Sequence, residues 1–191
     1  MKNLDQDVEN VAESLAAKQE AFDRVMQLSR EVIRSAGQAI TMMHNGDTKK
    51  AATVIKEMKG KVKSLQGIDT QFKYNTQQAY QEYVEAQVFY DIMAGDGVPR
   101  MSEIGVDPDA YLMGLMDVTG ELKREILESL RREEIKDAES YFEIMKSIYD
   151  GTRSIRFAEA VLPGFRKKQD VARIQLENAG SDILSFRNRG R

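Results

Sequence analysis

The sequence lacks or is poor in several residue types, and each shortage excludes a class of protein. Its 191 residues include no cysteine, no tryptophan and only three prolines. Without cysteine the chain can form neither disulfides nor cysteine–metal sites, which is typical of intracellular proteins. No apolar run approaches the roughly 20 residues that span a membrane, and the first residues lack the apolar core of a signal peptide. We therefore expect a cytoplasmic protein.

The sequence contains a single histidine, His44. One histidine excludes multi-histidine zinc sites. A carboxylate-bridged di-iron bundle would need Glu-x-x-His pairs, and the sequence contains none. His44 lies far along the chain from the acidic motifs described below, and we interpret it as a favourable cation at the end of the first helix.

The residues that are abundant favour helix almost throughout. Ala, Leu, Glu, Lys, Gln, Met and Arg dominate, and no segment alternates with the period of a strand. The pattern predicts an all-α fold, a single domain over residues 1–191 that forms an antiparallel bundle of about seven helices. The predicted helices cover residues 5–44, 48–65, 70–93, 108–131, 135–162 (bent near Gly151) and 163–186, with one turn at 102–105 and caps at Asp47 or Thr48 and at Asp107.

The first predicted helix is long and amphipathic. Its apolar residues follow a spacing of three and four from Val8 through Leu15 and Val32 to Met43. Such a stripe exposes more apolar surface than one partner helix covers, so we expect subunits to bury it against one another. Methionines at helical spacing, such as Met113 and Met116, are expected to fill the core or subunit contacts.

The charge is small overall but uneven along the chain. The net charge is −3, which argues against simple coating of nucleic acid, yet residues 151–191 carry nine Lys and Arg against four Asp and Glu. This segment either faces a polyanion or is a solvated helix with a basic tail, and charge alone favours the second interpretation.

Two acidic motifs carry the strongest chemical signal. Glu82 and Glu85 are three residues apart, and Asp117 and Glu121 are four apart, so each pair shares a face of its own helix. If the two helices pack together, four carboxylates converge, and their repulsion is costly unless a cation relieves it. Mg²⁺, a hard cation with oxygen ligands, would do so and would support phosphate chemistry. The alternative is four surface acids that pair with neighbours such as Lys123 or Arg124.

Two glycines interrupt the helix that holds the second motif. Gly114 and Gly120 each cost about 1 kcal/mol relative to alanine inside a helix. Either another helix or a ligand approaches closely there, or the helix is simply weak.

The two motifs together resemble those of the translin family. The segments are QEYVEA at residues 81–86 and DAYLMGLMDVTGEL at 109–122, and LSR at 28–30, IYDG at 148–151 and LSFRNRG at 184–190 resemble family segments too. The similarity spans nearly the whole chain in order. Within the family, the sequence is more similar to the branch of translin-associated factor X, the catalytic partner of translin.

The resemblance implies a seven-helix protomer, a closed hollow octamer and a Mg²⁺-dependent endoribonuclease, with Mn²⁺ as a possible substitute, that cleaves RNA inside the shell. The metal-site residues of that branch correspond to Glu82, Glu85, Asp117 and Glu121. In this hypothesis the first three are direct or water-mediated ligands, and Glu121 is a ligand or the general base. The alternatives are a translin-like shell that binds single-stranded RNA or DNA without cleaving it, and an adaptor bundle without a ligand.

The sequence departs from the animal proteins of this family by being shorter. It lacks their amino-terminal extension, and residues 94–106 form only a short connector. This compactness indicates a minimal, archaeal-type relative that self-assembles without a separate partner. Tyr83 and Phe89 could stack on a base, although core packing is the simpler interpretation. The candidate phosphate-binding residues are Arg24, Arg30, Arg34, Lys63, Lys73, Lys123 and Arg124.

Overall fold

A computed structural model describes residues 2–189, and every regular element in that range is an α-helix. The seven helices are α1 (Lys2–His44), α2 (Thr48–Gln66), α3 (Lys73–Ala94), the single turn α4 (Met101–Ile104), α5 (Pro108–Arg131), α6 (Ile135–Thr152) and α7 (Phe165–Arg189). The all-helical prediction is confirmed. None of the helices in this range is both long and apolar enough to cross a membrane.

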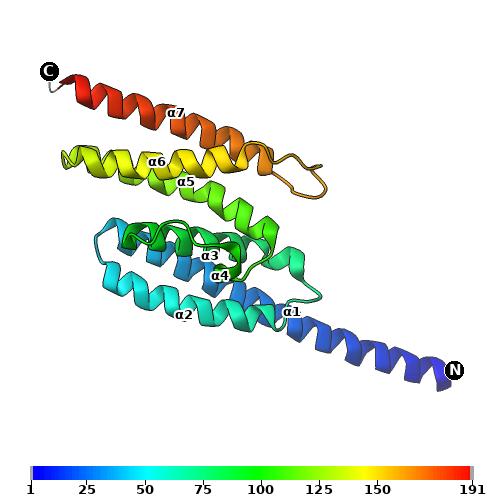
Figure 1. Ribbon diagram of the computed structural model, residues 1–191. Helices are drawn as coiled ribbons and strands as arrows, with labels where there is room; N and C mark the ends of the chain where they lie inside the picture. The colour runs from blue at the N-terminus through cyan, green and yellow to red at the C-terminus, as the bar shows by residue number, and fades with distance from the viewer. Residues whose placement is uncertain (1, 190–191) are drawn as a thin grey trace.

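The helices form two groups that meet where α3 packs on α5 (Figure 1). In the first group α1 contacts both α2 and α3, and in the second group α5, α6 and α7 contact one another. The core runs through both groups, and its largest fully buried side chains include Tyr83 and Phe89 of α3, Leu122 of α5 and Met145 of α6. The α3–α5 contact is therefore the middle of the molecule.

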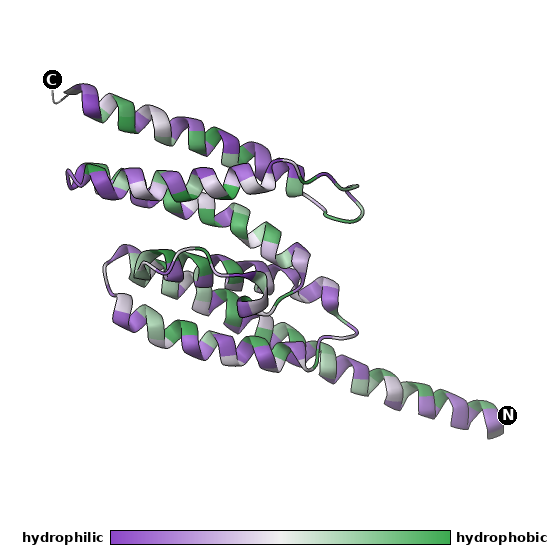
Figure 2. Cartoon of the chain, in the orientation of Figure 1, coloured by the Kyte–Doolittle hydropathy of each residue, from purple (hydrophilic) through white to green (hydrophobic). Residues whose placement is uncertain are grey.

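The amino-terminal half of α1 projects beyond the rest of the chain (Figure 1). Apolar and polar residues alternate along this arm in Figure 2, and Leu4, Val8, Val11 and Leu15 are 57–64% exposed. From Val25 onward the same stripe is buried in the core. The predicted stripe is thus present, but no described residue of this chain covers its first half.

The connection between α6 and α7 differs from the predicted helix over residues 135–162. The helix ends at Thr152, and a non-helical segment follows up to α7. The reason is a tertiary contact: the side-chain amide of Gln169 donates to the carbonyl oxygens of Thr152 (2.8 Å) and Ile155 (3.4 Å). A side chain from α7 therefore satisfies acceptors that a longer helix would have satisfied itself.

The predicted caps are also only partly confirmed. Asp47 and Asp107 stand at the N-cap positions of α2 and α5, but neither side chain makes a capping hydrogen bond. Each carboxylate instead accepts from a lysine, Lys50 for Asp47 (3.0 Å) and Lys73 for Asp107 (3.3 Å).

Gly114 explains how closely α3 and α5 approach. A Cβ atom added at this glycine would lie 2.6 Å from the Cβ of Val84 and 2.8 Å from the carbonyl oxygen of Gln81. Only glycine fits there without moving α3, so the cost of a glycine inside a helix is offset by close packing. This contact holds the acidic faces of the two helices against each other, which is the close approach that the sequence suggested.

Candidate active site

The α3 side of the acidic site consists of Glu82 and Glu85, both half-buried. Burial raises the pKa of each carboxyl, and repulsion from Asp117 and Glu121 raises it further. For Glu85 the pKa rises to about 8. Repulsion therefore acts across the α3–α5 contact, so each α3 carboxyl lies near enough to Asp117 and Glu121 to feel their charge.

The α5 side of the site also carries two carboxylates, but each of them contacts a side chain from another helix. Asp117 forms an ion pair with the ammonium group of Lys168, which comes from α7, and both side chains are about one-third exposed or less (27% and 33%). Glu121 accepts a hydrogen bond from Nε2 of His44 at 2.6 Å. The sequence suggested Lys123 or Arg124 as partners of the acids, but the cations that reach them come from other helices.

His44 ends α1 as predicted, but its side chain turns inward to the acids. Its side chain is only 3% exposed, and its Nδ1 lies 3.1 Å from Oε2 of Glu125. The other carboxylate oxygen of Glu125, Oε1, accepts from Arg132 at 2.8 Å. Burial alone lowers the pKa of His44, but the bonds to Glu121 and Glu125 outweigh it, and the net direction is upward. His44 is therefore a cation at the end of α1 and also a buried bridge between two glutamates, a role that the sequence did not predict.

Glu125 completes this chain of contacts. Burial by itself raises the pKa of Glu125, but the hydrogen bonds from His44 and Arg132 lower it below its usual range. A charged Glu125 keeps His44 in place, and His44 in turn fixes one oxygen of Glu121. The end of α1 thus determines the position of an acid that belongs to the candidate site.

The donor set suits a hard cation, since all four groups offer carboxylate oxygens. Within residues 2–189, however, no three Asp, Glu or His side chains already stand close enough together to ligate one ion. Two of the four carboxylates are engaged by Lys168 and His44. A metal would have to compete with these partners for the α5 carboxylates.

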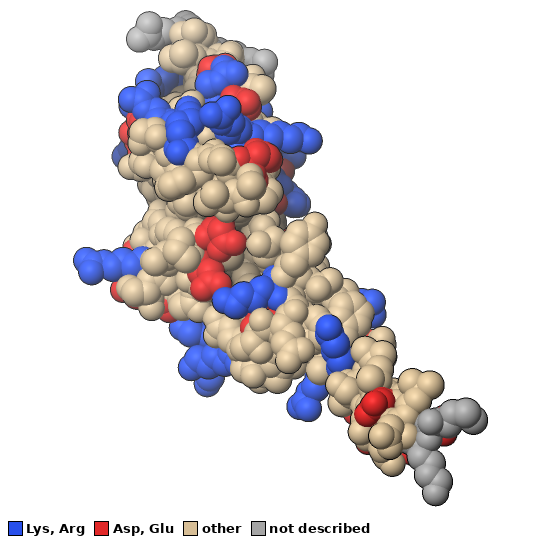
Figure 3. Space-filling view, turned by 90° about the vertical axis from the view of Figure 1, so that its right-hand side faces the viewer, with Lys and Arg blue, Asp and Glu red and all other residues tan. Residues whose placement is uncertain are grey.

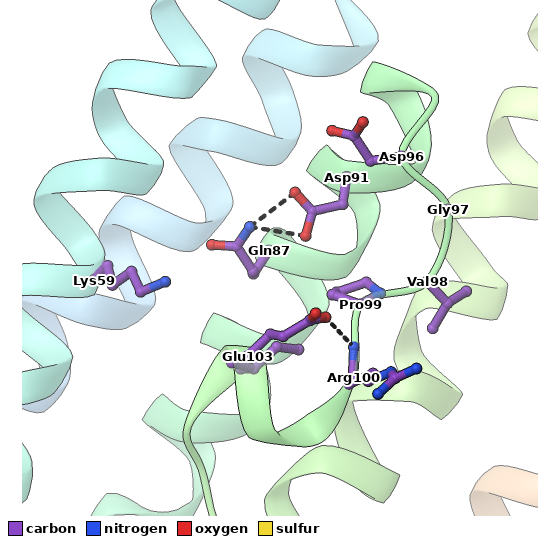
Figure 4. A pocket seen from close by; sticks show the side chains of 10 residues that line it. Lys59, Gln87, Asp91, Asp96, Gly97, Val98, Pro99, Arg100 and Glu103 are labelled. Atoms are coloured by element: carbon purple, nitrogen blue, oxygen red, sulfur yellow. Dashed lines mark hydrogen bonds between the residues drawn. The ribbon is translucent and has the colours of Figure 1, made fainter.

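A cavity of about 400 Å³ lies between α5 and the start of α7, beside Asp117. Met113, Met116 and Val171 line it together with Lys168. The two methionines are buried, as predicted, and they form an apolar wall next to the acidic groups. A larger hollow of about 500 Å³ lies beside α4 (Figure 4), and it mixes Lys59 and Arg100 with three acids, so its charges nearly balance.

The aromatic candidates and the basic candidates are not gathered at the site. Tyr83 and Phe89 are fully buried, which confirms core packing, and the ring of Phe89 lies 5.0 Å from that of His44. Six of the seven candidate phosphate-binding residues are exposed, and Lys123 is half-buried. They are spread over α1 (Arg24, Arg30, Arg34), α2 (Lys63), α3 (Lys73) and α5 (Lys123, Arg124). Their role in binding phosphate stays a prediction.

Sequence reasoning missed two residues that contact the acids, Lys168 and the inward-facing His44. Both lie more than 40 residues from their partners along the chain, at separations of 51 for Lys168–Asp117 and 77 for His44–Glu121. No spacing within one helix reveals such contacts. The only available signal was the basic character of residues 151–191.

Comparison with known proteins agrees with this architecture. A profile described as the Translin family matches residues 19–179. An uncharacterised protein of Methanocaldococcus jannaschii is 31% identical over 176 residues, which cover 90% of this chain and 79% of that protein. The fold is also similar to solved structures of proteins called C3PO.

One of these structures is AfC3PO in complex with duplex RNA, which is 28% identical, with a TM-score of 0.84 over 96% of this chain and 97% of the other. A crystal structure of AfC3PO is again 28% identical, with a TM-score of 0.86 and coverage of 96% and 98%. Apo-NeC3PO, at 24% identity, a TM-score of 0.87 and coverage of 94% and 96%, supports the fold alone. On the extent of the family match, this chain belongs to the translin family.

Proposed function

We propose that this chain is a metal-dependent endoribonuclease of the translin-associated factor X type, with Mg²⁺, or Mn²⁺ in its place, as the metal. The observation that carries the proposal is the charge repulsion across the α3–α5 contact, where burial and the charges of Asp117 and Glu121 raise the pKa of Glu82 and Glu85. Such a site favours a divalent cation. RNA as the substrate is supported by the similarity to AfC3PO, which was solved with duplex RNA.

In this proposal Glu82, Glu85 and Asp117 hold the metal directly or through water, and Glu121 is a further ligand or the general base. When bound, the metal would neutralise charge on the phosphate and activate a water molecule. Glu85 binds a proton near neutral pH and must release it before it can act as a ligand. His44 holds Oε2 of Glu121 and leaves its other oxygen available for a metal or for the attacking water.

Assembly belongs to the same proposal. The exposed apolar residues of α1, Leu4, Val8, Val11 and Leu15, form a stripe that a second copy can cover. The closed octamer that encloses RNA is taken from the family resemblance. Light scattering should give a mass well above that of one 21.7-kDa chain. A stable monomer at micromolar concentration would contradict it.

The decisive experiment is a nuclease assay on single-stranded and double-stranded RNA with Mg²⁺, Ca²⁺ or EDTA. The wild-type chain should cleave with Mg²⁺ and not with EDTA. Glu85→Gln and Asp117→Asn should not cleave, but they should keep the helical circular dichroism spectrum and the affinity for RNA measured in Ca²⁺. Cleavage by either variant at the wild-type rate would reject the assignment.

A second candidate function is a translin-like protein that binds single-stranded RNA or DNA without cleaving it. One observation favours it: Lys168 and His44 already compensate two of the four acids, as a purely structural cluster would require. The same assay separates the two functions. A wild-type chain that binds RNA but cleaves it with neither Mg²⁺ nor Mn²⁺ is the binding protein.

A further inference from the structure

A second charged hollow lies at the junction of α6 and α7. Its volume is about 290 Å³, and its lining residues are Tyr149, Arg153, Arg156, Arg166, Gln169 and Asp170. Three arginines against one aspartate give this hollow a positive balance. Figure 3 shows Lys and Arg side chains gathered toward the upper part of the molecule, on the side where α6 ends and α7 begins.

One of these arginines is held in a fixed orientation. Nη1 of Arg156 donates to the carbonyl oxygen of Ile155 at 2.7 Å and to Oε1 of Gln169 at 3.0 Å. Gln169 is only 6% exposed, and its Nε2 is bound to the carbonyl oxygen of Thr152. A guanidinium group has five N–H donors, so Nε and Nη2 of Arg156 keep theirs for another acceptor.

The other two arginines differ in how far they are neutralised. Arg153 has Asp150 at 3.5 Å, a loose and exposed ion pair. Arg166, in the first turn of α7, forms no ion pair with any residue from 2 to 189, and neither does Arg156. Two arginines therefore line one hollow without a carboxylate of their own, and Asp170 is the one acid among its described lining residues.

We propose that this hollow is a phosphate-binding site formed by Arg156 and Arg166, with Arg153 as a third contact. A phosphate group has several oxygens at tetrahedral angles, and guanidinium groups bind such oxygens in pairs. Tyr149 lines the same hollow and adds a hydroxyl and a ring for the sugar or base beside the phosphate. Tyr149 also belongs to the IYDG segment, which the acidic site does not use.

The phosphate belongs to a nucleic acid, either as a terminal phosphomonoester or as an internal phosphodiester. That assignment rests on the RNA-binding part of the proposed function and not on metal binding or cleavage. The hollow and the acidic site use different faces of α7, because Lys168 points to α5 while Arg166 and Gln169 face the end of α6. The two sites can therefore be tested separately.

The first test uses inorganic phosphate and the full chain in EDTA. Phosphate should raise the midpoint of thermal unfolding above that in chloride at matched ionic strength. The double variant Arg156→Gln/Arg166→Gln should lose this shift, and so should Arg166→Gln alone, which leaves the Arg156–Gln169 contact intact. The matched control is Arg187→Gln on the same helix, whose arginine pairs with Glu139 at the opposite end of α6 from the hollow. An equal phosphate shift in the wild type and both pocket variants would overturn the site.

The second test identifies the source of the phosphate. Short single-stranded RNAs with a 5′-phosphate or a 5′-hydroxyl are titrated in EDTA, so that cleavage plays no part. The double variant should bind about tenfold more weakly than wild type, with a salt slope smaller by about 0.7 for each phosphate that the protein no longer neutralises. A weakening confined to the 5′-phosphate RNA assigns the terminal group, and an equal weakening for both RNAs assigns the backbone.

The two tests also keep the proposals apart. A phosphate shift that depends on Arg166 in a chain that binds no RNA would support the phosphate site and refute the proposed ribonuclease. Unchanged affinity and salt slope in the double variant, in a chain that does bind RNA, would remove the site from RNA recognition.

Discussion

The two sides of the acidic site both carry two carboxyl groups, but in the part of the chain that the structure describes only those on α5 have a cationic partner. On α3, Glu82 and Glu85 have no cation at ion-pair distance among residues 2–189, and their pKa values are raised, that of Glu85 to about 8. On α5, Asp117 is paired with Lys168 and Glu121 is bonded to His44. Without a metal, the protein neutralises the α5 carboxylates with its own side chains, whereas Glu85 on α3 is neutralised by a proton near neutral pH.

This difference indicates what a divalent cation would have to do. It would displace a proton from α3 and compete with an ammonium and an imidazole on α5. A buried charge destabilises the fold much less when a partner of opposite sign is bonded to it. The arginines at the α6–α7 junction give the contrast, because they are exposed and can remain charged without a partner at little cost.

Replacing Glu85 should have the largest effect. Glu85→Gln resembles the protonated acid in shape, so the fold should remain while the metal loses a ligand. We expect RNA cleavage to fall by a factor of more than about 10², the lower end of what one catalytic carboxylate contributes. The measurement is the initial rate in Mg²⁺, with the exposed ion-pair variant Glu128→Gln on α5 as the control. Equal rates for the two variants would remove Glu85 from the site.

The same group predicts how stability depends on pH. The pKa of Glu85 is about 8 in the folded chain against an ordinary value of 4.5, so between these pH values the folded state holds a proton that the unfolded state has lost. Stability contributed by this proton is complete below about pH 4.5 and is lost as pH rises toward 8, with an upper limit of about 1.4 kcal/mol per pH unit.

Chemical denaturation in EDTA across that window measures this effect. Wild type should lose stability with rising pH faster than Glu85→Gln, and near pH 8 the variant should be the more stable of the two. Added Mn²⁺ should reverse that order. If the free energy of unfolding changed with pH equally in both proteins, the pKa of Glu85 would not be raised in the folded chain.

The acidic motifs and the close helix contact could be predicted from the sequence, whereas contacts between residues far apart along the chain could not. The spacing of Glu82 with Glu85 and of Asp117 with Glu121 lies within single helices, and Gly114 marked a close approach that the structure places at Val84. The side-chain partners were not predictable, because Lys168 and His44 reach the site from α7 and α1 through tertiary packing. The end of α6 at Thr152 escaped prediction in the same way, since Gln169 of α7 accounts for it.

Removing the imidazole should have a smaller effect than removing an acid. In His44→Gln both N–H donors lie on one nitrogen instead of on two separate ring nitrogens, so they cannot reproduce the bonds to Glu121 and Glu125, and Glu121 loses its fixed position. We expect Mn²⁺ affinity and cleavage to fall about tenfold, as is typical when a residue that orients a metal ligand is changed. Isothermal titration gives the affinity, and Arg131→Gln, an exposed residue of α5 that pairs with Glu128, is the control. An unchanged affinity would make His44 purely structural.

Removing the competing cation should have the smallest effect, and in the opposite direction. Lys168→Met deletes the ammonium that pairs with Asp117 but keeps most of the apolar stem that lines the adjoining cavity. Solvent reaches both side chains of this ion pair, which are 27% and 33% exposed, and weakens it. A solvent-accessible ion pair contributes about 0.2–1 kcal/mol, so the gain in Mn²⁺ affinity should be at most about fivefold. Lys167→Met, its neighbour on α7, should bind Mn²⁺ like wild type.

A weaker affinity of Lys168→Met for the metal would contradict this prediction. In that case Lys168 would help to assemble the site rather than compete for it, and the α5 carboxylates would need a cation from the chain even when the metal is bound.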